Sequence, residues 1–132
     1  MRFIDSNVFI YVLVQSPKNL YEACKRILER VEDGEETMVS LAVIREVVDW
    51  LEYNNRRREV EAFITALNSY QTLRKVSNVW WDFVEALSDM EKHNVDFVDA
   101  LILQIMKREN VREIYSNDLD FDGVDWVKRI FQ

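Results

Sequence analysis

The sequence is poor in two residue types that many enzymes and secreted proteins depend on. Its 132 residues include one cysteine, Cys24, and one histidine, His93. A single cysteine cannot form an internal disulfide, which is typical of proteins kept in a reducing compartment. A single histidine excludes a zinc site built from several histidines of one chain. We therefore expect a cytoplasmic protein whose chemistry depends on other side chains.

Glycine, proline and long apolar runs are also scarce. Two glycines and one proline argue against a disordered tail and against a β-sandwich with many tight turns. The longest apolar run, residues 8–14, is far shorter than the roughly 20 residues that cross a bilayer. Asp5 and Asn7 precede this run where a secretion signal carries basic residues. With 48% hydrophobic residues, the chain predicts one domain over residues 1–132 and no membrane association.

Positive charge is in deficit, since the formal net charge is −7. A surface of that sign repels the phosphates of nucleic acid unless its charge is uneven or cations intervene. The densest basic stretch is Arg56, Arg57 and Arg58, which could bind an RNA backbone. The alternative is a solvated helix surface whose arginines pair with nearby glutamates such as Glu59.

Helical periodicity alternates with short strand-like runs along the whole chain. Such alternation favours an α/β fold with a mostly parallel sheet flanked by helices. Segments with strand character are residues 2–4, 37–40, 72–77, 113–116 and 125–131. Segments with helical spacing of apolar residues cover residues 20–31, 41–54, 56–69, 80–87 and 98–105.

One of these helical segments carries an unusual number of aromatic residues. Trp80, Phe83, Val84 and Leu87 recur at helical spacing, so we expect them to form the core-facing side of a helix. Trp81 lies off that side, which suggests a contact with a second subunit or, as an alternative, stacking on a base.

Four acidic residues are expected at one edge of the predicted sheet. Asp5 directly follows the first strand, and Asp118 follows the fourth. Glu46 lies in the second turn of the helix after the second strand, and Asp99 begins the helix that leads to the fourth. Ligands of open α/β sheets bind beyond the carboxyl ends of the strands, so these carboxylates are predicted to converge.

Converging carboxylates repel one another unless a cation compensates their charge. Hard divalent cations take oxygen ligands, and Mg²⁺ typically combines a few carboxylates with water and substrate phosphate. Such an ion can activate water and neutralise a phosphoryl group. The pattern therefore suggests metal-assisted hydrolysis of a phosphodiester, with the cation offsetting the negative surface.

Each acid also has a plain structural interpretation. Asp96 and Asp99 have the spacing of a helix N-cap and a first-turn acid. Asp118 and Asp120 are consistent with turn residues, and Glu46 is consistent with a solvated helix surface. Only the joint placement of the acids favours a site.

Other acidic sites fit the residues less well. A calcium loop beginning at Asp118 would need a glutamate at its twelfth position, which is Arg129. A phosphatase of the haloacid-dehalogenase type needs a second acid two residues after the first, and that residue is Asn7. A receiver domain needs a lysine ending a later strand, and no such lysine is found.

Four blocks of the sequence together resemble the PIN-domain nucleases. "FIDSNVFIY" resembles the opening strand and Asp-[Ser/Thr]-Asn motif of that family. "VIREVVDWL" is similar to its helix with a single glutamate, "DFVDALILQIM" to its Asp-Ala-hydrophobic helix, and "IYSNDLDF" to its C-terminal acidic segment. The blocks occur in family order and span most of the chain, and the length resembles that of VapC-type toxins.

The resemblance implies a Rossmann-like PIN domain with four or five mostly parallel strands and a ribonuclease that depends on Mg²⁺ or Mn²⁺. It implies acidic metal ligands and catalytic residues at Asp5, Glu46, Asp99 and Asp118. By the same resemblance Asp120 is a further ligand or a supporting group, and Asn7 and Ser116 orient the acids by hydrogen bonds.

The resemblance also implies partners: RNA as substrate, an antitoxin protein and a second copy in a homodimer. Two other functions stay open. The chain could be an RNA-processing PIN nuclease without an antitoxin, or a non-cleaving module that binds RNA or protein. The intact set of mutually repelling acids favours a nuclease over a non-cleaving module.

Overall fold

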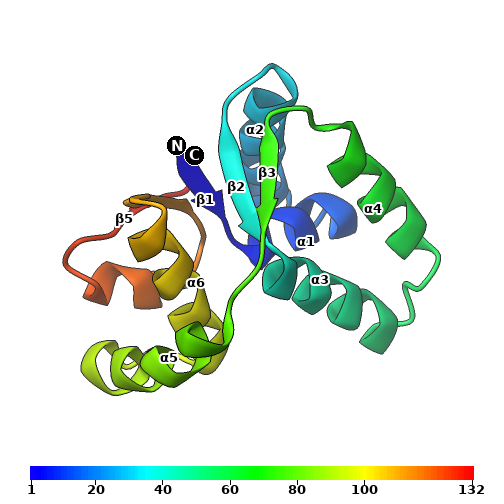
Figure 1. The fold of residues 1–132 in the computed structure, drawn as a ribbon. Coiled ribbons are helices and arrows are strands. Elements are labelled where there is room, and N and C mark those ends of the chain that lie inside the picture. The colour runs from blue at the N-terminus through cyan, green and yellow to red at the C-terminus, as the bar shows by residue number, and fades with distance from the viewer.

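A computed structural model describes residues 1–132 and places a parallel sheet between layers of helices (Figure 1). The strands are β1 (Arg2–Ile4), β2 (Thr37–Ser40), β3 (Leu73–Val76), β4 (Glu113–Tyr115) and β5 (Lys128–Ile130). The helices are α1 (Ser6–Val14), α2 (Lys18–Glu32), α3 (Leu41–Tyr53), α4 (Glu59–Ser69), α5 (Trp80–His93) and α6 (Phe97–Arg108), with a short 3₁₀ helix, η1, at Leu119–Gly123. The predicted α/β class and mostly parallel sheet of four or five strands are confirmed, and the sheet has five strands.

The strand order creates one switch point in the sheet. The order is β3-β2-β1-β4-β5, and every neighbouring pair is parallel. The chain moves outward from β1 to β2 and β3, then returns to the other side of β1 for β4 and β5. Ligand sites of doubly wound sheets lie where the order reverses, outside the carboxyl ends of the strands. Here that point lies beyond β1 and β4.

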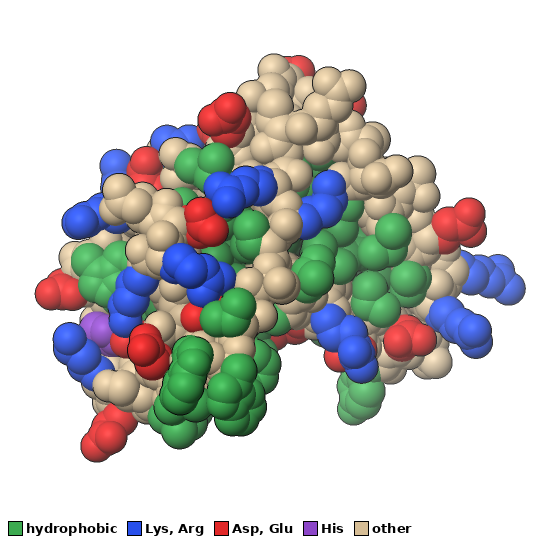
Figure 2. Space-filling model, in the orientation of Figure 1, with side chains coloured by type: hydrophobic (Ala, Val, Ile, Leu, Met, Phe, Trp, Pro, Cys, Tyr) green, Lys and Arg blue, Asp and Glu red, His purple; other side chains and the backbone are tan.

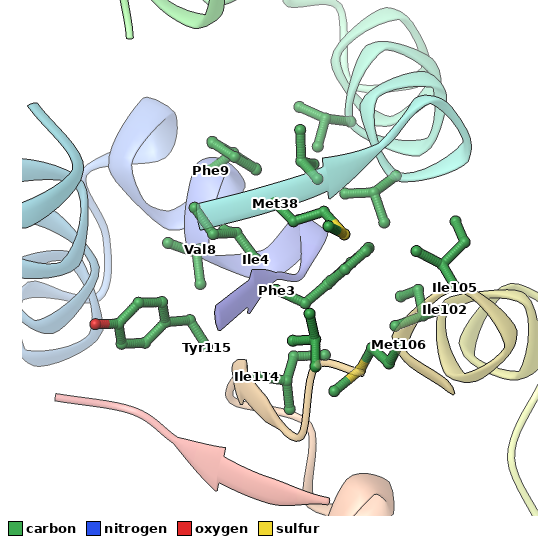
Figure 3. Close-up of a cluster of buried hydrophobic side chains, with 14 of the residues drawn as sticks. Phe3, Ile4, Val8, Phe9, Met38, Ile102, Ile105, Met106, Ile114 and Tyr115 are labelled. Atoms are coloured by element: carbon green, nitrogen blue, oxygen red, sulfur yellow. The ribbon is translucent and has the colours of Figure 1, made fainter. Parts of the chain in front are cut away.

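The core fills both faces of the sheet, as is usual for parallel strands. Successive residues of β1 point to opposite faces: Phe3 lies on the side of α6, and Ile4 lies with Val8 on the side of α1 (Figure 3). Ile102 of α6 packs on the same side as Phe3 and is 1% exposed. This packing fixes the beginning of α6 against the carboxyl ends of β1 and β4.

Polar caps set where the helices begin and end. Asp5, Ser40 and Asp96 stand at the N-caps of α1, α3 and α6 and accept hydrogen bonds from the first-turn N–H groups. The cap predicted at Asp96 is therefore present. Asn94 ends α5 in the left-handed region, at φ 53°, a conformation that asparagine tolerates better than most residues. No helix is both long and apolar enough to traverse a bilayer.

The expected orientation of α5 is wrong. Trp80 and Leu87, predicted to face the core, are 70% and 61% exposed. The buried residues of α5 are instead Asp82, Ala86 and Asp89. The amphipathic pattern correctly marks an apolar side of the helix, but that side faces outward.

The partner of α5 explains this orientation. The neighbouring α6 presents polar side chains to it: Arg108 Nη1 donates to Asp82 Oδ2 at 2.8 Å, and Lys107 Nζ donates to Asp89 Oδ2 at 2.9 Å. Gln104 also donates to Asp89. Buried carboxylates require such partners, so the acidic side of α5 turns inward and its apolar side is left outside.

Candidate metal centre

Three carboxylates meet at the switch point of the sheet. Oxygen atoms of Asp5, Asp99 and Asp118 all lie within 4.8 Å of one another. Asp5 follows β1, Asp118 lies just past β4, and Asp99 sits in the first turn of α6. The three residues are distant in sequence, and the parallel sheet brings them to one edge.

Asp5 is fixed by hydrogen bonds on both of its oxygens. Oδ1 accepts the Ser6 backbone N–H at 2.7 Å, while Oδ2 accepts the Ser116 hydroxyl at 2.7 Å and the Asn7 amide at 3.1 Å. The side chain is 4% exposed. Burial raises the pKa of Asp5 to about 6, against the lowering effect of the bonds from Ser116 and Ser6. The charges of Glu46 and Asp118 contribute to the same rise.

Ser116 and Asn7 connect the first turn of α1 to the segment that follows β4. Ser116 Oγ accepts the backbone N–H of Asp118 at 3.0 Å while it donates to Asp5. Asn7 Oδ1 accepts the backbone N–H of Asn117 at 3.0 Å, and its Nδ2 lies 3.2 Å from Ser116 Oγ. These contacts fix the position of Asp5 relative to the segment that carries Asp118.

Of the three acids, Asp99 is the one whose carboxylate has no hydrogen-bond donor to offset its burial. It is 7% exposed, and its side chain accepts no hydrogen bond from any N–H or O–H group of the chain. Burial is the main reason that its pKa is raised to about 9, and the charges of Asp5, Asp96, Asp118 and Glu46 add to the effect. Asp96 serves as the cap by accepting the Asp99 N–H at 2.8 Å. Both interpretations of this segment are therefore compatible: Asp96 caps the helix, and Asp99 belongs to the acidic cluster.

Glu46 and Asp120 lie outside the three-residue cluster. Glu46, half-buried on α3, acts on the cluster through its charge, which raises the pKa of Asp5 and of Asp99. Asp120 is exposed on η1, and its backbone N–H donates to Asp118 Oδ1 at 2.9 Å. Asp118 thus combines the turn role with a place in the cluster.

The arginine stretch lies at the far end of α3 from the cluster. The helix continues for seven residues beyond Glu46, about 10 Å at its ordinary rise, before the loop begins. Arg56 pairs with Glu59 at 3.0 Å, which matches the solvated-surface alternative. Arg57 and Arg58 are exposed and form no ion pair.

The donor set fits a hard divalent cation. None of Asp5, Asp99 and Asp118 forms an ion pair with a lysine or arginine, whereas the buried acids of α5 do. Buried acids are seldom found without a compensating positive charge or metal. Three carboxylates, one of them without any donor, offer the oxygen ligands that Mg²⁺ or Mn²⁺ prefers.

Two buried acids were not anticipated from the sequence. Asp82 and Asp89 are 7% and 4% exposed and belong to the contact between α5 and α6. Burial acts to raise the pKa of Asp82, but hydrogen bonds from Arg108, the Val79 N–H and Asn78 lower it below its ordinary value. Asp82 and Asp89 are seven residues apart and therefore lie on one side of the helix, opposite the tryptophans. This spacing is the feature of the sequence that could have indicated their burial.

Comparisons with known proteins agree with this architecture. The model of the PIN-domain family matches residues 2–127. Among solved structures, the Mycobacterium tuberculosis toxin VapC20, described as cleaving the sarcin-ricin loop, superposes with a TM-score of 0.80 at 18% identity, over 96% of this chain and 97% of that one. VapBC2 of Rickettsia felis, bound to a DNA fragment from its promoter, gives 0.72 at 13% identity, over 98% and 96%.

A toxin–antitoxin complex from Klebsiella pneumoniae is similar as well, with a TM-score of 0.67 at 16% identity, over 97% of this chain and 96% of that one. No curated protein matches the sequence. At these identities the structural matches establish the fold, and the family model establishes the relationship.

Proposed function

Because the chain belongs to the PIN-domain family, we propose that it is a ribonuclease dependent on a divalent cation held by Asp5, Asp99 and Asp118. The observation that carries the proposal is the contrast between the buried acids of α5 and the three acids of the cluster, of which Asp5 and Asp99 are buried and Asp118 is half-buried. Those of α5 have lysine and arginine partners, and those at the switch point have none. A cation is the compensation that the second set lacks.

The residues have distinct roles in this proposal. Asp5 and Asp118 are held by Ser116 and by backbone N–H groups, so they are pre-positioned ligands. Asp99 has no hydrogen-bond donor and is the ligand that depends most on the cation. Glu46 stands at the edge of the cluster, where its carboxylate is suited to orient or deprotonate an attacking water.

A bound Mg²⁺ or Mn²⁺ would supply a water of lowered pKa and neutralise charge on the phosphodiester. The chain has a net charge of −7, so the cation would also create an attractive point for phosphate on a repelling surface. Arg57 and Arg58, free of acidic partners, are proposed to contact the RNA backbone away from the reacting phosphate. Asp120 is proposed as a supporting residue that holds Asp118 rather than as a direct ligand.

We further propose that the chain is the toxin of a toxin–antitoxin pair. The support is the similarity to VapC20 and to two toxin–antitoxin complexes over nearly the whole of both chains. An RNA-processing nuclease without an antitoxin would use the same site. Co-expression with the product of an adjacent small gene decides between the two, because only a toxin is inhibited by that product.

The test of the ribonuclease activity is cleavage of mixed RNAs with Mg²⁺, with Mn²⁺ and with EDTA. Asp99→Asn is expected to abolish cation-dependent cleavage and to keep the fold. Asp96→Asn is the matched control, because asparagine caps a helix as well as aspartate does and Asp96 is outside the cluster. Cleavage that persists in EDTA or in Asp99→Asn would refute the proposal. Folded wild type without cleavage would favour a non-cleaving module.

A further inference from the structure

A cavity of about 360 Å³ lies between the end of α5, the end of α6 and the segment that precedes β5. Its volume is at the lower end of the range for small-molecule sites, about 300–1,000 Å³. Three of its lining side chains are basic, Lys92, Lys107 and Arg112, and none is acidic. At the left of Figure 2, Lys and Arg side chains lie on both sides of the single histidine of the chain. This cavity, which we call the basic pocket, concentrates positive charge on a chain of net charge −7.

Most of the positive charge of the basic pocket is free to meet a ligand. Lys92 and Arg112 are exposed and form no ion pair. Lys107 alone shares its charge with an acid, Asp89. The cavity around Arg56–Arg58 differs, because two glutamates belong to its lining and partly neutralise it. An anion therefore finds two unpaired cations at the basic pocket.

The rest of the lining is largely apolar and includes an aromatic ring. Met106 and Val111 are 0% and 3% exposed, and the indole of Trp126 is half-buried beside them. A purely anionic ligand has no use for such a wall, and a purely apolar ligand has no use for three basic groups. A flat ring next to cations is the combination by which proteins hold a nucleobase together with its phosphate.

The buried acid Asp89 holds the wall of the basic pocket in place. It accepts a hydrogen bond from Lys107 Nζ at 2.9 Å, and His93 Nε2 lies 3.7 Å from its other oxygen. Lys107 Nζ in turn lies 5.9 Å from the centre of the Trp126 ring. These contacts order lining side chains before a ligand arrives, which reduces the entropy that binding must overcome.

We propose that the basic pocket binds one nucleoside monophosphate unit. The base packs against Trp126, and the phosphate meets the ammonium group of Lys92 and the guanidinium of Arg112. The side-chain amide of Asn110, in the same lining, offers a donor and an acceptor for the edge of the base. The unit is either a free nucleotide or one nucleotide of an RNA strand, since both present the same ring and phosphate.

A single short helix, η1, joins the basic pocket to the candidate metal centre. Asp118 is the N-cap of η1, and Trp126 follows its last residue, Gly123, by three positions. A Cβ atom at Gly123 would lie 4.0 Å from the carbonyl oxygen of His93, so η1 ends against the end of α5. At about 2 Å per residue, η1 spans on the order of 10 Å. An RNA strand with one phosphate at the metal centre can thus extend toward the pocket.

The test is calorimetric titration with adenosine 5′-monophosphate in EDTA, where no cation reaches the acidic centre. The nucleotide is expected to bind at least 10-fold more tightly than inorganic phosphate or adenosine alone, because each of these fills only part of the pocket. Trp126→Leu is expected to weaken nucleotide binding by about 10-fold, the effect of losing one base–aromatic contact. Trp81→Leu is the matched control, at a 67% exposed tryptophan outside the pocket, and should bind like wild type.

A second variant guards against misfolding, because Lys92 is exposed and its replacement leaves the wall intact. Lys92→Met should weaken binding of the nucleotide and of phosphate by about 3-fold or more, and should make nucleotide binding less sensitive to salt. Lys18→Met, at an exposed lysine of α2 without an ion pair, should change neither. A nucleotide that binds no more tightly than phosphate would overturn the proposal, as would binding that depends on Trp81 and not on Trp126.

The source of the nucleotide unit is decided by titrating a short single-stranded RNA in EDTA. If Trp126→Leu weakens RNA binding as well, the unit belongs to an RNA strand. If the variant weakens binding of the nucleotide alone, the pocket takes a free nucleotide. Only the RNA strand as source rests on the function proposed above, and no cleavage is measured here. A chain that binds the nucleotide without cleaving RNA, or the reverse, therefore separates the two proposals.

Discussion

The Ser116 hydroxyl donates a hydrogen bond of 2.7 Å to Asp5 Oδ2, across 111 positions of the chain. This bond joins the residues that directly follow β1 and β4, the two strands at the switch point, and it opposes the rise in the pKa of Asp5 that burial causes. Ser116 Oγ also accepts a hydrogen bond from the backbone N–H of Asp118. One hydroxyl thus contacts two of the three clustered residues, Asp5 through its carboxylate and Asp118 through its backbone.

Ser116→Ala is expected to lower the affinity for Mn²⁺ by roughly 10-fold, the lower end of the usual effect of removing a residue that orients a ligand. The pKa of Asp5 should rise further, so the pH at which cleavage reaches half its maximum should increase. Titration with Mn²⁺ and a pH profile of cleavage measure the two effects. Ser6→Ala is the control: the Ser6 hydroxyl lies 3.5 Å from Asp5, and its backbone N–H, the stronger donor, is retained.

The free energy of unfolding of the cation-free chain is expected to fall as pH rises from about 4 to about 9. Asp5 and Asp99 have pKa values of about 6 and about 9 in the folded chain, against an ordinary 3.8. Between these values the folded state keeps protons that the unfolded state has released, so rising pH favours unfolding. The free energy of unfolding in urea, measured with EDTA at pH 5 and pH 8, should differ by an amount on the order of a few kcal/mol. An unchanged or increasing stability at pH 8 would contradict this expectation.

Asp99→Asn should stabilise the chain in EDTA at pH 8 and remove most of the stabilisation that Mg²⁺ gives the wild type. At pH 8 the folded chain keeps Asp99 mostly protonated, at a pKa of about 9, whereas the unfolded chain ionises it, and this difference favours unfolding. The amide ionises in neither state, so the difference disappears, and a ligand of the cation is lost. Melting temperatures with EDTA and with Mg²⁺ measure both effects. If Mg²⁺ raised the melting temperature of the variant as much as that of the wild type, Asp99 would not be a ligand.

Lys107→Met is expected to destabilise the fold by about 1–3 kcal/mol, because Asp89 would keep its burial and lose a charged partner 2.9 Å away. Methionine keeps most of the side-chain length, so the loss reports on the charge. Lys92→Met, at an exposed lysine without an ion pair, should change stability little. Urea unfolding of both variants makes the comparison, and equal losses would show that the pair contributes nothing specific.

Much of the fold and of the acidic cluster followed from the sequence for a simple physical reason. A parallel sheet gathers the residues after its strands at one edge, and this geometry alone predicts that Asp5 and Asp118 lie together. Asp99 was placed there because an α/β unit brings a helix N-terminus to that edge. The metal-ligand roles of these residues remain a prediction, as do those of Glu46 and Asp120.

The direction of α5 could not be predicted from its own residues. Periodicity shows that Trp80 and Leu87 share a side of the helix, but the neighbouring surface decides whether that side is buried. Here that surface is set by Lys107 and Arg108 at the end of the following helix, α6, whose side chains pair with the acids of α5. A local hydrophobic pattern does not contain that information.

The position of β1 at the centre of the sheet has a consequence for biosynthesis. β1 ends at Ile4, whereas one of its two neighbours, β4, begins only at Glu113, so β1 leaves the ribosome well before the strand beside which it lies. Asp5 acquires the Ser116 hydroxyl and the Asp118 carboxylate only when that segment has emerged. A nascent chain therefore carries an incomplete acidic centre until residue 118 has been translated, and any truncation before that residue leaves the centre without one of its three carboxylates.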